Sequence, residues 1–110
     1  MTFKNIKTDP LNNGISAHLP LENGNTLTLD VSWNNNDGEK WSFDVLINVL
    51  GRNDFDYQTS HFNRDTLKEA LNYLEIKATA TEINAIILFI SEQKDFMRPK
   101  ASSYENYHGI

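Results

Sequence analysis

The chain contains no cysteine, which excludes disulfide bonds, thiolate nucleophiles and cysteine-based zinc sites. The absence fits a reducing compartment, and we expect a cytoplasmic location. Long hydrophobic runs are lacking as well, since the longest, AIILFI at residues 85–90, is far too short to span a bilayer. The first fourteen residues contain no apolar stretch of the kind found in a signal peptide, so we expect that they are not a signal peptide.

The common motifs of nucleotide binding and hydrolysis are also missing. No P-loop, GxGxxG or G-x-S-x-G segment occurs. The three histidines, His18, His61 and His108, are far apart and show none of the spacings that bind metal ions. We therefore expect no metal site and no cofactor.

Residues 34–38, NNNDG, resemble the start of an EF-hand calcium loop. When this loop is aligned on Gly38, its first position is Trp33 and its twelfth is Asp44, and neither fits the pattern. The flanking residues alternate like strands rather than helices. We therefore interpret the segment as a turn between two strands.

Acidic residues exceed basic ones, and the excess lies in one region. The net charge is −5 at neutral pH, and residues 10–62 hold seven acidic residues against two basic ones. Residues 63–110 are nearly balanced, with seven acidic and six basic residues. An acidic surface disfavours nucleic acid and anionic membranes and favours a basic protein partner.

The first half of the chain alternates apolar and polar residues, which predicts half-buried strands. The apolar positions are odd-numbered in all four runs, which cover residues 15–21, 27–33 and 41–49 and a fourth run that begins at Phe55. Hairpins that pair odd residues with odd ones need loops of odd length. We therefore predict three-residue loops at residues 22–24, 36–38 and 51–53, each containing a glycine.

These loops predict the register of the sheet. Pro20 lacks an N–H group, so we expect the first strand to lie at a sheet edge. The predicted cross-strand pairs are Leu19–Leu27, Trp33–Trp41, Val31–Phe43, Asp30–Asp44, Ile47–Tyr57 and Val49–Phe55.

The second half of the chain changes to the helical period. Apolar residues from Leu67 to Leu74 follow the i, i+3, i+4, i+7 spacing, with Asn63 as the predicted N-cap. Thr79 and Glu82 form a capping box that opens a second helix. The isoleucine-rich residues 83–90 would also fit a buried strand, but the capping box and the length favour a helix.

Together these patterns predict a single α+β domain of 110 residues. A four-stranded antiparallel meander would be covered on its odd-numbered face by two C-terminal helices. Residues 1–12 would form an N-terminal segment, and residues 96–110 a tail that is either loosely docked or disordered.

The even-numbered face of this sheet would be left open and acidic. Two carboxylates opposite each other in a ladder repel, so the predicted Asp30–Asp44 pair points to a cation or a basic partner. Three interpretations stay open: a solvated acidic face, a docking surface for a basic protein, and a paired-carboxylate catalytic or metal site like that of glycosidases. The third is the least favoured, because an open sheet face offers no pocket that excludes water.

The segments GEKWSFDVLINVLG (residues 38–51) and DTLKEALNYLE (residues 65–75), in an acidic chain of this length, resemble small bacterial immunity proteins. These include proteins that neutralise contact-dependent growth-inhibition toxins, and small phage anti-defence proteins look similar. The resemblance covers roughly residues 26–75 and rests on layout and charge. It implies a cytosolic protein without catalytic residues that binds a basic, nuclease-like toxin domain and blocks its active site.

We therefore expect a non-enzymatic binding protein of the immunity-protein or antitoxin kind. Its partner would be a basic toxin domain or a nucleic-acid-binding enzyme, and it would be a monomer or weak dimer that binds neither nucleic acid nor membrane. The alternatives are a phage anti-defence inhibitor, a small enzyme using His61 or His18 with an aspartate, and an accessory subunit paired through Leu46 and Leu50. The predicted partner-binding residues are Asp30, Asp37, Glu39, Asp44, Leu46, Asp54 and Asp56.

Overall fold

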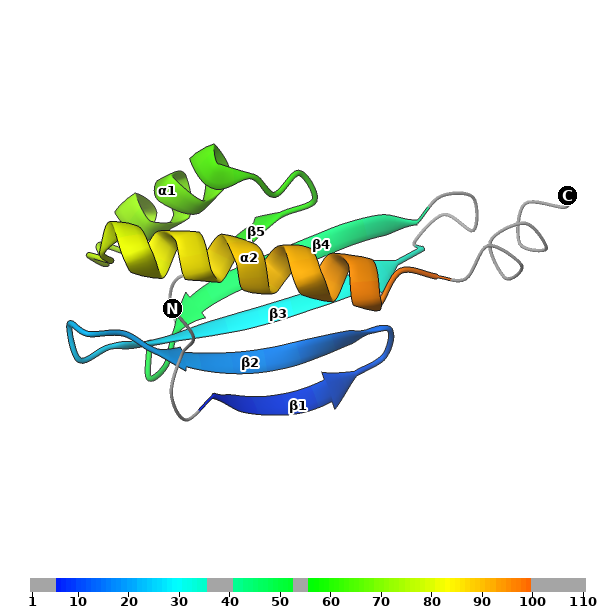
Figure 1. Ribbon diagram of the computed structural model, residues 1–110, viewed down its shortest axis with the longest axis horizontal. Helices are drawn as coiled ribbons and strands as arrows, with labels where there is room; N and C mark the ends of the chain where they lie inside the picture. Colours follow the sequence, from blue (N-terminus) through cyan, green and yellow to red (C-terminus); the bar gives the residue numbers. More distant parts are fainter. Residues whose placement is uncertain (1–5, 36–40, 53–55, 100–110) are drawn as a thin grey trace, which may run out of the picture.

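The computed structural model describes residues 6–35, 41–52 and 56–99 and has an α+β fold (Figure 1). Within these residues, five strands form one antiparallel sheet in the order of the chain. The strands are β1 (Lys7–Leu11), β2 (Gly14–Pro20), β3 (Thr26–Asn34), β4 (Ser42–Val49) and β5 (Tyr57–Thr59). Helices α1 (Arg64–Tyr73) and α2 (Ala80–Phe96) follow, and both lie on the same side of the sheet.

The two periodicities of the sequence place the core between the sheet and the helices. Every odd-numbered residue of β3 is buried, and those of β4 are buried as well. The even-numbered residues of both strands are only half-buried, because no helix covers that face. From the helices, Leu67, Leu74, Ile86 and Ile90 complete the core. The α+β class and the covered odd face are therefore confirmed.

The hairpin between β2 and β3 has the predicted register. Leu19 pairs with Leu27, as expected from a three-residue loop. The Leu21 N–H donates to the Asn25 carbonyl at 2.8 Å and closes that loop. Gly24 has a φ of +94°, the left-handed conformation that a G1 bulge requires of its glycine.

The β4–β5 ladder also agrees with the prediction as far as it is described, because Ile47 pairs with Tyr57. Gly51 has a φ of +88° in the turn between these strands. The other predicted pair, Val49–Phe55, lies outside the described residues.

The predicted register of β3 and β4 is wrong by two residues. Trp33 pairs with Phe43 rather than with Trp41, and Asp44 pairs with Ser32 rather than with Asp30. The described ladder runs to the Asn34–Ser42 pair, and the predicted loop at residues 36–38 lies outside the described residues. A shift of two keeps every odd residue in the core, so the hydrophobic pattern cannot distinguish the two registers.

The fourth predicted strand is the fifth strand of the sheet, because the N-terminal segment contributes β1. All five residues of β1 are exposed, so the segment shows no apolar alternation that would reveal a strand. A tight turn at Asn12 and Asn13 joins it to β2, and Asn13 takes a φ of +58°. β2 is therefore not an edge strand, and Pro20 lies at its end, outside the described ladder with β1.

Both predicted helix starts are confirmed. The Asn63 side chain caps α1 by accepting from the Thr66 N–H at 2.9 Å. At α2, the Glu82 N–H donates to Thr79 Oγ1 at 3.0 Å, and the Thr79 N–H donates to Glu82 Oε1 at 2.9 Å. The isoleucine-rich segment is helical, as the capping box predicts.

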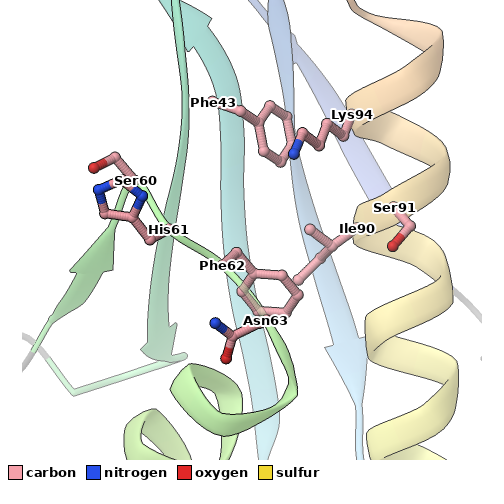
Figure 2. Close-up of a pocket in the computed structure, with 8 residues that line it drawn as sticks. All are labelled: Phe43, Ser60, His61, Phe62, Asn63, Ile90, Ser91 and Lys94. Carbon is pink, nitrogen blue, oxygen red and sulfur yellow. The ribbon is translucent and has the colours of Figure 1, made fainter.

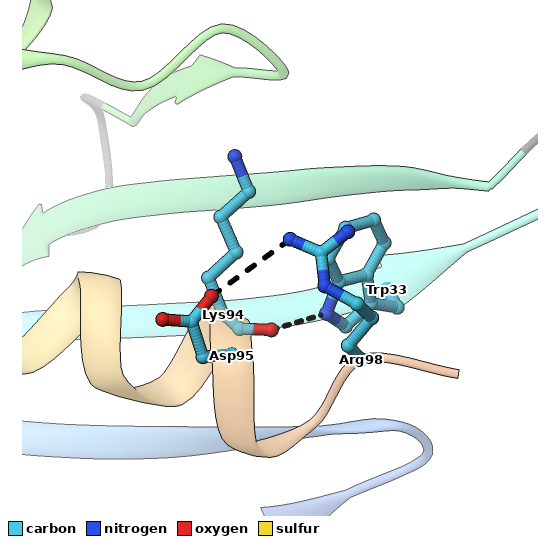
Figure 3. Close-up of polar contacts among 4 residues, drawn as sticks. All are labelled: Trp33, Lys94, Asp95 and Arg98. Carbon is cyan, nitrogen blue, oxygen red and sulfur yellow. Dashed lines mark hydrogen bonds and ion pairs between the residues drawn. The ribbon is translucent and has the colours of Figure 1, made fainter. Parts of the chain in front are cut away.

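The C-terminal turn of α2 is anchored to the sheet through β3 (Figure 3). Trp33 Nε1 donates to the Lys94 carbonyl at 3.0 Å, and the Arg98 guanidinium lies 5.0 Å from the Trp33 ring centre. Arg98 also forms a 3.8 Å ion pair with Asp95, but both side chains are mostly exposed and such pairs contribute little. These contacts fix the far end of the helix layer over β3.

Candidate functional site

The face of the sheet that carries no helix is the surface on which the sequence placed its candidate site. We call it the open face. It consists of the residues on that side of β1 to β4, namely Lys7, Asp9, Leu11, Gly14, Ser16, His18, Pro20, Thr26, Thr28, Asp30, Ser32, Asn34, Ser42, Asp44, Leu46 and Asn48.

Asp44 is tied into the sheet by its neighbours. Asn34 Nδ2 donates to Asp44 Oδ2 at 2.7 Å, and the Ser42 hydroxyl lies 3.3 Å from Oδ1. The residue directly opposite is Ser32, another polar side chain. Asp44 is therefore a half-buried carboxylate that already has hydrogen-bond donors, rather than one half of a repelling pair.

Asp30 lies on β3 between Ser16 of β2 and Leu46 of β4. The Asp9 carboxylate of β1 belongs to the same row, because Asp9 pairs with Ser16. Two strand spacings separate Asp9 from Asp30, or about 10 Å. Repulsion between Asp9 and Asp30 over that distance is largely screened at physiological salt.

Leu46 is the apolar residue at the middle of the open face. It pairs with Asp30 of β3 on one side and with Gln58 of β5 on the other. Its neighbours on the same face of β4 are Asp44 and Asn48. Leu46 is half-buried, so part of its side chain is accessible from this face. The immediate neighbours of Leu46 are polar, so it offers an apolar contact inside a polar rim, as protein interfaces do.

The other predicted residues divide into two groups. Asp56 is exposed and immediately precedes β5, at the rim of the open face, and Leu50 just after β4 is 55% exposed. Asp37, Glu39 and Asp54 lie outside the described residues.

Sequence reasoning missed the part of this face that β1 provides. Lys7 pairs with His18 and Asp9 pairs with Ser16, so β1 extends the open face by one strand. The signal that could have revealed it is the Asn-Asn-Gly turn at residues 12–14, since hairpin turns favour Asn and Gly. Gly14 is required there, because a Cβ at this position would clash with the Val31 carbonyl oxygen.

Asp30 and Asp44 are diagonal neighbours, so the directly opposed carboxylate pair that the sequence predicted is not formed. Among the described residues, no group of three or more His, Asp or Glu side chains is arranged to hold a metal ion. No described helix is both long and apolar enough to cross a membrane.

A pocket of about 370 Å³ lies on the other side of the sheet, where α2 passes the connection between β5 and α1 (Figure 2). The aromatic rings of Phe43 and Phe62 form part of its wall, together with Ile90. His61 and Lys94 are also among its lining residues.

His61 was one of the two histidines of the enzyme alternative, which requires a carboxylate beside it. The described residues that line this pocket include no carboxylate. The His61 side chain is exposed, and in Figure 2 it points away from α2. His18 lies on the open face opposite Lys7 and Thr28. Neither histidine has a described carboxylate hydrogen-bonded to it.

Comparison with known proteins gives no match to any protein-family model, curated protein or solved structure.

Proposed function

We propose that this protein is a non-enzymatic inhibitor of the immunity-protein kind, which uses its open face to bind and block a basic, nuclease-like toxin domain. The observation that carries the proposal is the position of Leu46, an accessible apolar residue surrounded by Asp30, Asp44, Asn48 and Gln58. This part of the sheet is rigid, because β3 and β4 each have a neighbouring strand on both sides.

Charge supports a basic partner. The described acidic residues on and beside the open face are Asp9, Asp30, Asp44 and Asp56, against one lysine, Lys7. Nuclease-like domains carry Lys and Arg where they bind phosphate groups, so an acidic surface attracts them at long range. Leu46 then supplies the buried contact that holds the complex once it has formed.

The corrected register changes the reason for expecting a partner. Asp30 and Asp44 are diagonal neighbours rather than a directly opposed pair, so the repulsion that the sequence suggested is reduced. The reason for expecting a partner is now the complementarity of charge between this face and a basic surface. Carboxylates about one or two strand spacings apart can each pair with a different basic side chain of the partner.

The proposal is tested with the product of the gene that lies next to the gene for this protein. We expect that gene to encode a toxin with a basic catalytic domain, and we expect expression of the present chain to restore growth of cells producing that domain. Purified protein should then inhibit the isolated toxin domain at a one-to-one ratio. A phage anti-defence role would instead show inhibition of a host defence nuclease and no protection against the neighbouring gene product.

Failure to protect against any neighbouring or host nuclease, with both proteins folded and soluble, would contradict an inhibitory role.

A further inference from the structure

The pocket between α2 and the β5–α1 connection has a composition unlike the rest of the molecule. In a chain of net charge −5, the charged side chain that lines it is a lysine, Lys94, and none of its described lining residues is acidic. Its volume of about 370 Å³ is in the range of small-molecule sites.

Lys94 lies over the apolar part of this pocket. Its Nζ is 6.0 Å from the centre of the Phe43 ring, and Figure 2 shows the side chain extending from α2 toward that ring. Among the described residues, no carboxylate forms an ion pair with Lys94. Lys94 is exposed, and its ammonium group is available to pair with an anion.

The apolar part can hold a flat group. Phe62 is half-buried and points toward Ile90, which is 1% exposed and fixed in the core (Figure 2). Ser60 and Ser91 are also lining residues, and in Figure 2 the Ser60 hydroxyl points away from α2.

We propose that this pocket binds a small organic carboxylate with a flat apolar body. The carboxylate pairs with Lys94 Nζ, and the apolar body packs on the Phe62 ring beside Ile90. The site is independent of the proposed inhibitory function, because it lies on the helical side of the sheet and the open face lies on the other.

The test uses 3-phenylpropionate as the probe and its uncharged amide as the matched compound, titrated into the full-length protein at low salt and followed by two-dimensional ¹⁵N–¹H NMR. We expect the acid to cause saturable shifts of the protein signals, confined to Phe43 and residues 60–63 and 90–94. The amide should bind about fivefold more weakly, as expected for loss of a partly exposed ion pair.

Variants separate the two parts of the site. Lys94→Met keeps the aliphatic stem and should weaken binding of the acid about fivefold while leaving the amide unchanged. Lys7→Met removes a lysine from β1 and should change neither. Ser91→Trp replaces an exposed residue and should fill the pocket, abolishing binding of both compounds without loss of the folded spectrum.

The proposal is overturned if the acid causes no saturable shift at about 20 mM, a concentration at which a ligand of this size should be detected. Equal binding of acid and amide, or unchanged binding by Ser91→Trp, overturns it as well. Asp30→Lys on the open face should leave binding of the probe unchanged, so the result bears on this pocket alone.

Discussion

Glu82 is a buried carboxylate with two structural tasks. Its Oε1 accepts from the Thr79 N–H and completes the capping box of α2, while its Oε2 accepts from the Glu22 N–H at 2.8 Å. Glu22 lies in the β2–β3 loop, so this side chain, 1% exposed, joins that loop to the helix layer. The capping box was predictable from Thr79 and Glu82, but the contact with Glu22 joins residues sixty positions apart and leaves no local signal.

Glu82→Ala should therefore cost about 2 kcal/mol or more of the free energy of unfolding. The substitution leaves two N–H groups without their acceptor and removes a negative charge from the helix N-terminus. Urea denaturation followed by circular dichroism measures the effect. The control is Glu92→Ala, an exposed position of the same helix, which should change stability by less than about 0.5 kcal/mol. Equal effects of the two substitutions would contradict this role.

Tyr57 titrates above the usual range of a tyrosine. Partial burial of the phenol raises its pKa, and the hydrogen bond from its hydroxyl to Glu69 Oε2, at 3.0 Å, raises it further, as does the negative charge of Glu69. The neutral phenol is the form that the folded state favours. Its contribution to stability is therefore complete below pH 10 and is lost as the pH rises through the raised pKa.

We expect a ¹³C NMR titration of the tyrosine Cζ signals to place the pKa of Tyr57 above 10. Glu69→Gln should lower the pKa of Tyr57, because it removes the carboxylate charge and weakens the acceptor. Glu92→Gln, which lies elsewhere, should leave it unchanged. A Tyr57 pKa below 10 in the unmodified protein would contradict the contact with Glu69.

Among the elements, the sequence predicted which face each strand buries but not how all strands are aligned. Alternation assigns every odd residue of β3 and β4 to the core, and the structure confirms this. The predicted register was correct between β2 and β3, where Gly24 closes the loop, and wrong between β3 and β4, although the loop predicted there also contains a glycine. There, two registers bury the same side chains, and the observed one avoids placing Asp30 against Asp44.

The β3–β4 register can be measured by NMR in solution. Directly opposed residues of antiparallel strands give strong contacts between either their Hα or their amide protons. We expect such contacts for Ser32–Asp44 and Trp33–Phe43. The contacts that would contradict the observed register are Asp30–Asp44 and Trp33–Trp41.

β1 shows why an element can be invisible to pattern reasoning. Its residues are all exposed, and one of them is Pro10, so neither alternation nor strand propensity indicates a strand. β1 forms because the turn at Asn12 and Asn13 places it antiparallel to β2, whose edge would otherwise be unpaired. At the candidate site, this adds Asp9 and Lys7 to the face that the sequence assigned to later strands.

For the whole molecule, the sequence predicted one helix-covered face and one open face of the sheet, and both are observed. The acidic character of the open face could be predicted too, because parity assigns Asp30 and Asp44 to it whatever the register. The neighbours of Leu46 could not, since they depend on a register that alternation leaves undetermined. The pocket at Lys94 was equally hidden, because it brings together residues of β4, the β5–α1 connection and α2.

The central claim is that the open face, rather than the helical side, binds a basic partner. The most direct measurement is the association and dissociation rate of the protein with its toxin domain by surface plasmon resonance. Asp30→Lys and Glu92→Lys change the net charge equally, but Asp30 lies on the open face and Glu92 is exposed on α2. Leu46→Ala and Leu88→Ala form a second matched pair, since Leu88 is 58% exposed on α2.

We predict that Asp30→Lys slows association about tenfold at low salt and that Leu46→Ala speeds dissociation about tenfold. The two α2 variants should change either rate less than about twofold, and all four should remain folded. Unchanged binding by Asp30→Lys and Leu46→Ala, or equal losses in the α2 variants, would contradict the assignment of the open face as the binding surface.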